Sequence, residues 1–540
     1  MKVIVFFDRF HMRHLKSLNK ANLEVSGNLM KKLRKSFMNI STLIGLELIF
    51  QFIFLIAVIY LLYRKSQLFY SVNVFINIAV VFWVIQKNQE PEYKVAWISL
   101  IALFPVFGGL FYLIFSGNRL LPAEKKRMWQ MEARIRQFLK RNDHIIDKLK
   151  EEDAVSAQMA DYIQTYGPYT VYYEQESIYF STGEEYFERL KAALQSAERF
   201  IFMEYYIIDE GKMWGEILEI LKTKAKAGVD VRVIYDDMGS FMKLPNFYMK
   251  KLASYGIKCC RFNPMIPIIS ARYNTRDHRK ITVVDGLYGF TGGINIADEY
   301  INAKEKYGHW KDMGLMIQGE AVWSFTVMFL TMWDYVTNTK TDIKAYQVAA
   351  ARENDVSTRG ITAPYSDNPL DSEHVGKNIY LNLINKAKRY INITTPYLII
   401  SNKLLDALCN AAKNGVDVSM ITPYKPDKWY VHYVSKSYYK KLVESGVKIY
   451  EYAPGFIHGK NFVVDDKYAV VGTINMDFRS LYLHFECGVW MMDTCSVLEV
   501  KKDFDNTLSQ CLMITQADIL RSGSFKRIIG RLLRIFAPLM

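Results

Sequence analysis

Two short motifs, 180 residues apart, carry side chains that could act on a phosphate ester. Each has a histidine, a lysine two residues later, an aspartate five residues after the lysine and an asparagine ten residues after the aspartate: His278, Lys280, Asp285 and Asn295 in the first motif, His458, Lys460, Asp465 and Asn475 in the second. A single histidine two residues before a lysine is common by chance. The complete pattern repeated at identical spacing is not.

The chemistry of these side chains fits phosphoryl transfer. Residues two apart on a strand share a face, so each histidine and its lysine point the same way. Imidazole can attack phosphorus or donate a proton near neutral pH. Lysine binds phosphate as a point charge, and asparagine adds a neutral donor. The two motifs together supply a nucleophile, an acid and two cations, which suffices for phosphodiester exchange without a metal.

The doubled motif resembles that of the phospholipase D superfamily. Its surroundings, Asn274 to Lys280 and then Gly292 to Tyr300, are similar to those of bacterial cardiolipin synthases. The resemblance extends from about residue 70 to the C-terminus. It implies an α/β fold of two similar phospholipase D-type sandwich lobes with the active site between them, preceded by an N-terminal helical transmembrane region.

By this resemblance the nucleophile is His278, the histidine of the first lobe, and His458 protonates the leaving group. The residues alone leave the opposite assignment open, because the two motifs are symmetric. We expect Lys280, Lys460, Asn295 and Asn475 to hold the non-bridging phosphate oxygens, where charge builds up. Asp285 and Asp465 belong to the motif, but we interpret them as structural and charge-balancing because each follows a strand, where aspartate is an ordinary turn residue.

An imidazole nucleophile needs a carboxylate on its other ring nitrogen. Trp310-Lys311-Asp312 resembles a Trp-Arg-Asp signature of the synthases, with lysine in place of arginine, and Asn475 to Ser480 followed by Glu486 resembles the second-lobe equivalent. We therefore expect Asp312 to pair with His278 and Glu486 to pair with His458. Glu204, on the apolar strand of residues 201–208, is expected to line the cleft as a substrate-binding residue.

The chain also repeats itself around the two motifs. A helix leads to an apolar strand at 200–208, and later at 390–399. Each strand is followed by a second helix and a Gly-Val-Asp-Val sequence, at Gly228 and again at Gly415, where the glycine stops the helix. Helices that alternate with apolar strands predict an α/β sandwich in each half. The expected lobes are 161–350 and 351–520, divided at the polar stretch from Arg352 to Ser372.

Three apolar segments precede the lobes, at about 43–63, 69–86 and 95–115 within a transmembrane region of 43–117. Roughly 20 residues of helix cross a bilayer core of ~30 Å. A buried core helix is the alternative for each segment. Positive-inside scoring favours a cytoplasmic N-terminus. It also favours a cytoplasmic position for the cluster of lysines and arginines that follows the third segment. Three crossings cannot satisfy both, so the sequence leaves open whether the second segment crosses completely.

Charge is concentrated at the two ends. The chain has a formal net charge of +14, of which the basic tail 1–42 carries +7 and residues 521–540 carry +5. The remaining body is therefore close to neutral, which opposes nucleic acid as a partner. Basic tails beside apolar segments favour anionic membrane lipid. Residues 525–540 predict an amphipathic helix that either lies in the membrane interface or docks on the protein. Charged residues of 118–160 predict a connecting helix.

Six scattered cysteines without a C-x-x-C pair indicate neither a disulfide framework nor a zinc site. No nucleotide-binding loop is present, so we expect no cofactor and no metal. The resemblance implies a multi-pass enzyme of the bacterial cell membrane. It is expected to convert two phosphatidylglycerol molecules to cardiolipin and glycerol through a phosphohistidine.

The alternatives are a hydrolytic phospholipase D, a phosphodiesterase nuclease and a lipid-binding scaffold without activity. The near-neutral body opposes the nuclease, and two intact motifs oppose the scaffold. The membrane side of the lobes, the oligomeric state and the acyl-chain preference stay open, as does phosphatidylethanolamine as the phosphatidyl donor.

Overall fold

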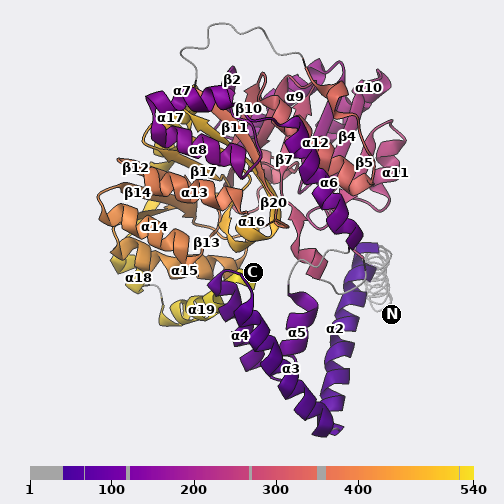
Figure 1. Cartoon of the computed structure of the whole chain (residues 1–540), viewed down its shortest axis with the longest axis vertical. Coiled ribbons are helices and arrows are strands. Elements are labelled where there is room, and N and C mark those ends of the chain that lie inside the picture. The colour runs from indigo at the N-terminus through magenta and orange to yellow at the C-terminus, as the bar shows by residue number, and fades with distance from the viewer. Residues whose placement is uncertain are drawn as a thin grey trace, which may run out of the picture. The chain divides into compact units, whose positions relative to one another are not determined.

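The computed structural model describes residues 40–65, 67–116, 122–266, 271–348, 360–371, 373–521 and 523–539 (Figure 1). The chain divides into two compact units. Among the described residues, the first unit holds 40–61 and 265–266, and the second holds the rest. The basic N-terminal tail expected at 1–42 lies almost entirely outside the described residues, as do 349–359 of the expected boundary stretch.

The first lobe is built on a seven-stranded mixed sheet in the order β2-β10-β8-β7-β3-β4-β5. Its strands are β2 (Glu176–Phe180), β3 (Phe200–Tyr205), β4 (Asp230–Asp236), β5 (Lys258–Phe262), β7 (Lys280–Val284), β8 (Tyr288–Gly292) and β10 (Gly314–Gln318). Its helices are α9 (Gly183–Ser196), α10 (Lys212–Lys226), α11 (Tyr248–Ala253) and α12 (Val322–Thr337). The central strand β3 is buried along its whole length, as the apolar run of its sequence predicts.

The second lobe repeats this plan in a larger sheet, in the order β1-β11-β20-β18-β17-β12-β14-β15-β21. Its strands are β1 (Tyr172–Tyr173), β11 (Ile361–Asp367), β12 (Tyr390–Thr394), β14 (Asp417–Pro423), β15 (Lys448–Tyr452), β17 (Asn461–Val464), β18 (Tyr468–Gly472), β20 (His484–Met492) and β21 (Cys511–Ile514). Its helices are α13 (Val375–Lys386), α14 (Asn402–Lys413), α15 (Trp429–Glu444), α16 (Phe478–Tyr482) and α17 (Cys495–Leu508).

Both halves use the same turn where the repeat predicts a helix stop. Gly228 follows α10 with φ of 92°, and Gly415 follows α14 with φ of 91°. A residue with a side chain rarely adopts this left-handed conformation, so glycine ends each helix and sends the chain into the next strand. The predicted fold of two similar α/β lobes is confirmed.

The lobes are joined by an exchange of short strands. β6 (Arg276–Asp277) of the first lobe runs parallel to the start of β20 in the second lobe, with Phe485 opposite Asp277. In the reciprocal position, β16 (Gly455–Ile457) of the second lobe runs parallel to β9 (His309–Lys311) of the first. The helix α12 packs on β7 of the first lobe and also contacts β11 of the second. Each lobe therefore places a short segment against a strand of the other; β20, the strand that receives β6, lies at the centre of Figure 1.

The expected connecting segment of 118–160 contains three helices rather than one among its described residues. They are α6 (Pro122–Phe138), α7 (Asp143–Glu152) and α8 (Ala154–Thr165). The break before α8 is set by Asp153, whose carboxylate accepts hydrogen bonds from the backbone N–H groups of Val155 and Ser156. This is an N-cap, which begins a new helix. The apolar side of α6 packs on α12.

Two helices among the described residues are long and apolar enough to cross a membrane. They lie at Ile44–Arg64, within α2 (Ile40–Lys65), and at Gln67–Gln86, which is α3. The third expected span is wrong as a single helix, because the segment is divided into α4 (Pro91–Leu103) and α5 (Gly108–Phe115). Pro105 and the two glycines that follow it lie at this division, and proline disfavours a helical residue before it.

A polar network holds the break between α4 and α5. The Asn73 amide of α3 donates to the carbonyls of Pro105 and Val106 at 3.0 and 3.3 Å. Asn77 donates to the Pro105 carbonyl and accepts from the backbone N–H of Gly109 at 3.0 Å. In an apolar environment every backbone group needs such a partner. The two asparagines that interrupt the apolar sequence of α3 therefore serve the broken helix beside it.

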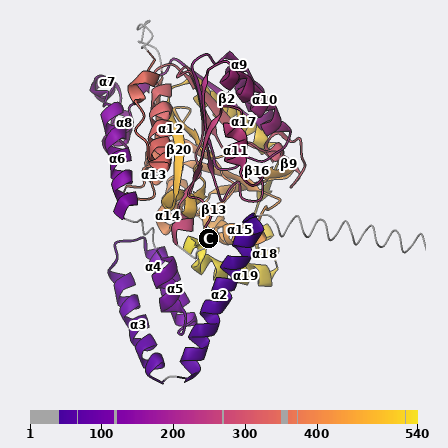
Figure 2. The ribbon, with the colours of Figure 1, turned by 90° about the vertical axis from the view of Figure 1, so that its right-hand side faces the viewer.

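The hairpin of α3, α4 and α5 is fixed to the second lobe at its base. Glu90, just before α4, forms ion pairs with Lys377 at 3.1 Å and with Lys403 at 3.2 Å. The Tyr93 ring of α4 lies edge-on against Phe478 and Tyr482 of α16, with centroids 5.6 and 6.0 Å apart. Figures 1 and 2 show the hairpin extending from the side of the lobes where α16 and α19 lie.

The C-terminal helix α19 (Ser524–Ile535) docks on the protein, which is one of the two alternatives left by its sequence. It docks on α15, where a Cβ atom at Gly530 would lie 2.5 Å from the Tyr433 carbonyl, and where Arg534 stacks on Tyr438 with its guanidinium 3.8 Å from the ring. Its outer side stays apolar and exposed, with Phe525 at 75%, Ile528 at 54% and Leu532 at 56% of full exposure. Only one face of the amphipathic helix is covered by the described residues.

Candidate active site

The strand exchange sets the position of both motif histidines. His278 follows β6, and its backbone N–H donates to the Phe485 carbonyl of the second lobe at 2.9 Å. His458 follows β16, and its backbone N–H donates to the Lys311 carbonyl of the first lobe at 2.7 Å. Each histidine is therefore held by a strand of the lobe to which it does not belong. The side chains of both are buried.

The carboxylate partners are crossed relative to the expectation. His278 Nδ1 lies 2.8 Å from Glu486 Oε1, and His458 Nδ1 lies 2.7 Å from Asp312 Oδ2. The predicted pairs, Asp312 with His278 and Glu486 with His458, are wrong, although the two acids themselves were identified. The reason is the strand exchange, which brings each histidine next to the strand that carries the acid of the opposite lobe.

The two motif lysines complete one buried cluster with the histidines. Lys280 and Lys460 are buried, and each ammonium donates to the carbonyl of the histidine two residues earlier. Burial lowers the pKa of Lys280 to about 8 and the pKa of Lys460 to about 7. Burial disfavours the charged ammonium and outweighs the charges of Glu486 and Asp312, which act in the opposite direction. A bound phosphate would restore the charge of the ammonium groups.

Electrostatics show that all four groups share one site. Burial, together with the charge of Lys280, lowers the pKa of His278 well below its usual value, and Lys460 and His458 add to the effect. Burial and Lys460 lower the pKa of His458 to about 4. Positive groups from both motifs thus act on each other across the lobes. A dianionic transition state placed among them would be strongly stabilised.

The pKa values of the two carboxyl groups are shifted in opposite directions. Burial raises the pKa of Glu486 well above its usual value. Burial also acts to raise the pKa of Asp312, but the charges of His458 and Lys460 outweigh it, and that pKa is lowered. The Asp312 carboxylate also accepts the backbone N–H of Met313 at 2.9 Å, while Glu486 accepts the hydroxyl of Thr473. Asp312 is therefore the more firmly ionised partner.

The motif aspartates lie at turns and bind backbone rather than the histidines. Asp285, with φ of 54°, accepts the N–H groups of Glu198, Arg199 and Phe200 at 2.7 to 2.8 Å. Asp465, with φ of 59°, accepts those of Lys388, Arg389 and Tyr390 at 2.7 to 2.9 Å. Each carboxylate fixes the start of its lobe's central strand to the end of the histidine strand.

Two of the three expected substrate-binding residues are bound to other groups of the protein. Asn295 accepts the backbone N–H of Ile207 at 3.0 Å and donates to the Tyr300 hydroxyl at 2.6 Å, so its amide is engaged by the protein. The Asn475 carbonyl oxygen is buried and has no partner among the described residues. Glu204 does not line the cleft: it is fully buried and forms an ion pair with Arg279 at 2.5 Å. That expectation is wrong because β3 is covered on both faces.

Several residues near the histidines were not assigned a role from the sequence. The His484 ring lies 5.7 Å from that of His278, and both of its nitrogens are buried without a hydrogen bond to a described residue, although Nδ1 lies 3.8 Å from Glu486 Oε1. In the other half, Trp310 lies 5.5 Å from His458, and its indole nitrogen is likewise buried without a partner. His484 precedes Glu486 by two residues, and Trp310 precedes Asp312 by two residues, so the sequence shows the same spacing in both lobes. The Tyr206 ring also lies 5.0 Å from His278.

Among the described residues, one group has atoms close enough to hold a metal ion. His278, His484 and Glu486 offer ligand atoms within 4.8 Å of one another. The His278 Nδ1 atom is already hydrogen-bonded to Glu486, which is the arrangement of an imidazole oriented by a carboxylate. The orientation of His278 by Glu486 therefore explains why these side chains lie close together.

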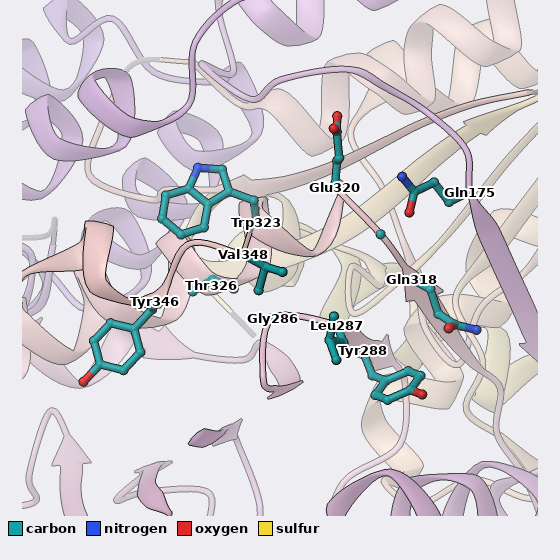
Figure 3. A pocket seen from close by; sticks show the side chains of 11 residues that line it. Gln175, Gly286, Leu287, Tyr288, Gln318, Glu320, Trp323, Thr326, Tyr346 and Val348 are labelled. Carbon is teal, nitrogen blue, oxygen red and sulfur yellow. The ribbon is translucent and has the colours of Figure 1, made fainter. Parts of the chain in front are cut away.

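A surface hollow of about 240 Å³ lies beside the turn that follows Asp285 (Figure 3). It is lined by Gln175, Gly286, Leu287, Tyr288, Gln318, Gly319, Glu320, Trp323, Thr326, Tyr346 and Val348. This lining contains no histidine, lysine or arginine. The lining therefore lacks both an imidazole and a cation for a phosphate, and the histidine cluster, which has both, is the candidate active site.

Comparison with protein families finds two matches. Residues 190–333 and 380–508 match the family described as "Cardiolipin synthase, PLD-like domain". Residues 75–117 match "Phospholipase_D-nuclease N-terminal". The first match covers both lobes and each of the two histidine motifs. The second covers most of the α3–α5 hairpin.

Curated relatives are similar over most of the chain. An uncharacterized protein of Streptococcus mutans is 42% identical over 467 residues, covering 86% of this chain and all of that protein. Cardiolipin synthase 2 of Bacillus cereus is 35% identical and covers 87% of this chain and 91% of its own. The cardiolipin synthase of Geobacillus kaustophilus is 34% identical and covers 84% and 90%.

Among solved structures, phosphatidylserine synthase of Haemophilus influenzae aligns with a TM-score of 0.54 at 17% identity. The alignment covers 68% of this chain and 94% of that chain. At this level of identity the likeness concerns the fold. It agrees with two lobes of the same architecture in one chain.

Proposed function

The chain belongs to the cardiolipin synthase family of the phospholipase D superfamily and is a phosphatidyltransferase; from this premise we propose that it makes cardiolipin from two molecules of phosphatidylglycerol and releases glycerol. The relatives from Bacillus and Geobacillus are cardiolipin synthases by name. The specific substrate and the role of each side chain are our proposals.

The observation that carries the proposal is the pair of crossed imidazole–carboxylate contacts, His278 with Glu486 and His458 with Asp312, beside two buried lysines. A carboxylate on Nδ1 fixes the tautomer, so that Nε2 is free for chemistry. One imidazole can then form a bond to phosphorus while the other supplies a proton. The lysines are placed to neutralise the non-bridging oxygens.

We assign the nucleophile to His278 and the acid to His458. A nucleophile must be neutral, and burial and Lys280 lower the pKa of His278 well below its usual value. An acid must carry a proton. Burial and Lys460 lower the pKa of His458 to about 4, while Asp312 acts in the opposite direction, as the anionic phosphate of a bound substrate would. Family resemblance suggests the same assignment.

The reaction follows in two balanced steps. His278 Nε2 attacks phosphorus of the first phosphatidylglycerol, the bond to the headgroup glycerol breaks, and His458 protonates the departing oxygen. The headgroup hydroxyl of the second phosphatidylglycerol then loses its proton to His458 and attacks the phosphohistidine. The phosphorus–nitrogen bond breaks, which yields cardiolipin and restores both histidines.

A membrane location supports this substrate. Two described helices are apolar and long enough to span a bilayer, and the α3–α5 hairpin satisfies its own backbone groups as a lipid environment demands. The exposed apolar stripe of α19 and its cations suit the interface. We propose a multi-pass protein of the bacterial cell membrane that meets its lipid substrates and anionic membrane lipid directly.

The decisive experiment uses the detergent-purified full chain with phosphatidylglycerol as the sole lipid. We expect cardiolipin and glycerol in equal amounts, and neither product from His278→Ala. Phosphatidic acid without cardiolipin would replace the proposal with the hydrolytic phospholipase D. Absence of all three products would refute phosphatidylglycerol as the donor.

A further inference from the structure

A cavity of about 600 Å³ lies where the C-terminal helices pack on the second lobe. Its walls come mainly from α15, from α18 (Gln516–Arg521) and from α19. This volume is within the range of ligand-binding sites in proteins. No histidine or lysine of the two motifs lines the cavity, and neither does Asp312 or Glu486. The cavity is therefore separate from the candidate active site.

Positive charge predominates in the lining of this cavity. Six cationic side chains contribute to it, against three carboxylates. The cations are Lys436, Lys440, Arg521, Lys526, Arg527 and Arg531. A hollow lined mainly by one sign of charge concentrates ligands of the opposite sign. The lining therefore suits an anion.

Two of the carboxylates compensate the cations of α15. Glu451 is buried and lies 3.1 Å from Lys436. Glu444 lies 3.7 Å from Lys440. The third carboxylate, Asp518 of α18, accepts the backbone N–H just before its own helix at 3.0 Å. The acids are thus engaged on α15 and α18, and none of them compensates a cation of α19.

The cations of α19 have no acidic partner. Lys526, Arg527 and Arg531 form no ion pair with a described residue, and Arg527 donates to the neutral hydroxyl of Ser524 at 3.2 Å. Ammonium and guanidinium groups bind phosphate oxygens through charge-assisted hydrogen bonds. One wall of the cavity therefore offers three cations to a phosphate group.

An apolar surface adjoins this wall. Residues three and four apart on a helix are neighbours on its surface, so Arg531 lies between Ile528 and Ile535. Both of these side chains are exposed, as are Phe525 and Leu532 on the same side of α19. A free phosphate ion would leave this apolar surface in water. An amphipathic ligand covers it with acyl chains while its phosphate occupies the cavity.

The cavity is also close to the membrane hairpin. Arg531 lines a second hollow, of about 310 Å³, together with Pro91 and Glu92 at the start of α4. Figures 1 and 2 show α19 on the side of the lobes from which the hairpin extends. Given the proposed membrane location, on which this step rests, the headgroup of a lipid at the bilayer surface is within reach of α19.

We propose that Lys526, Arg527 and Arg531 bind the phosphate of an anionic membrane phospholipid in this cavity, with its acyl chains along the apolar side of α19. The lipid is held there and not converted. The one histidine of the lining, His432, has no carboxylate contact among the described residues and no second imidazole beside it in the lining. The bound lipid anchors the second lobe to an anionic bilayer.

The test maps the lipid on the protein by photolabelling. The full-length His278→Ala variant, which the proposed mechanism leaves inactive, is reconstituted in phosphatidylcholine vesicles. The vesicles contain a small fraction of phosphatidylglycerol with a diazirine at the carboxyl end of one acyl chain. Irradiation marks the residues that the lipid contacts, and mass spectrometry identifies the marked peptides. We expect label on α15 and α19 that excess unlabelled phosphatidylglycerol displaces and inorganic phosphate does not.

Paired variants test the role of charge. Lys526→Gln combined with Arg531→Gln should lower the label on α19 by about tenfold or more, because two charge-assisted contacts are lost. Lys526→Arg combined with Arg531→Lys keeps both charges and should retain most of the label. The matched control, Lys413→Gln with Lys441→Gln, removes two exposed cations outside the lining and should leave the label unchanged. Melting temperatures show that each variant remains folded.

The outcomes separate this site from the proposed function. Equal label in the charge-loss variant and in the matched control would overturn the site, because it would show contact with the bilayer without recognition of the headgroup. Displacement by inorganic phosphate would overturn the lipid in favour of a free anion. Cardiolipin formation has no part in the readout, so a labelled cavity in a protein that makes no cardiolipin would refute the proposed function and leave this site intact.

Discussion

The two halves of the active site carry the same motif but differ in the residues around it. Beside His278 stand Glu486, supported by the Thr473 hydroxyl, and the polar ring of His484. Beside His458 stand Asp312 and the indole of Trp310, which packs against Tyr300 and Phe456 at 4.9 and 4.8 Å. One half is polar and the other is aromatic.

A further difference lies directly after each histidine. Arg279 is buried in an ion cluster with Glu204 and Asp277, whereas Gly459 stands where a Cβ atom would lie 1.9 Å from the sulfur of Met313. The shared motif supplies the reactive groups, and burial together with the motif lysines lowers the pKa of both histidines. Duplication therefore provides two similar imidazoles, and their surroundings allow one to be the nucleophile and the other the acid.

A substrate with a better leaving group should give the largest contrast between variants of the two histidines. In His278→Ala, formation of a phosphoenzyme should fall by about 10⁴-fold or more with any substrate, as for removal of a covalent nucleophile. In His458→Ala, the loss should be similar with phosphatidylglycerol but within about tenfold with phosphatidyl-p-nitrophenol, whose leaving group needs no proton. The burst of p-nitrophenol and the acid-labile label on the protein measure this step.

The reverse pattern, a burst kept in His278→Ala and lost in His458→Ala, would exchange the two roles. Wild-type protein provides the control for burst size. Each variant's melting temperature would show that it remains folded.

Replacing each carboxylate by its amide tests the crossed pairing, with a smaller expected effect on the rate. Glu486→Gln should slow the burst with phosphatidyl-p-nitrophenol by about 10²-fold, because it disturbs the tautomer of His278. Asp312→Asn should leave that burst nearly intact and slow the reaction of phosphatidylglycerol by about the same factor. Pairing within each lobe predicts the opposite assignment, so a slow burst in Asp312→Asn would contradict the crossed geometry.

The sequence predicts the reactive groups of this site better than their neighbours. His278, His458 and the two lysines follow from spacing alone, and both acids were identified from the stretches after the motifs. Their crossing was not predictable, because it depends on β6 pairing with β20 and β16 with β9. Strands of two and three residues carry too little periodicity to reveal a partner that lies in the other lobe.

The fold shows the same limit. Apolar runs and glycine stops correctly predict two α/β lobes, because the apolar side chains of each central strand already indicate that the strand is buried. The 95–115 segment is almost entirely apolar, so composition predicts one span. Pro105 and the glycines after it mark the break, and the contacts with Asn73 and Asn77 hold it. The expectation for Glu204 fails for a similar reason, because its partner Arg279 lies outside its own strand, between β6 and β7.

The lysines predict a pH dependence in which activity and stability move in opposite directions. Burial lowers the pKa of Lys460 to about 7 and that of Lys280 to about 8. Above these values the ammonium groups lose their charge, so kcat/KM should fall by about tenfold per pH unit on the alkaline side. The pH profile of cardiolipin formation measures this limb.

The stability effect has the opposite sign. The unfolded chain keeps these lysines protonated up to about pH 10.4, so between pH 7 and that value it binds more protons than the folded protein. The free energy of unfolding therefore rises with pH through this window. Lys460→Met should flatten the rise, which melting temperatures of both proteins at several pH values will show. Parallel curves for wild type and variant would contradict the buried charged lysine.

The motif aspartates should give the smallest effect and one confined to stability. Asp285→Asn and Asp465→Asn keep a residue that tolerates positive φ and weaken three backbone contacts in each lobe. The cost should be about 2 kcal/mol at Asp285, whose carboxylate is buried, and about 1 kcal/mol at the more exposed Asp465. Denaturant midpoints measure the difference, with turnover of the folded fraction retained. Because neither aspartate contacts a histidine, a loss of turnover without a loss of stability would show that the motif aspartate acts on the chemistry after all, and equal costs would show that burial does not distinguish the two turns.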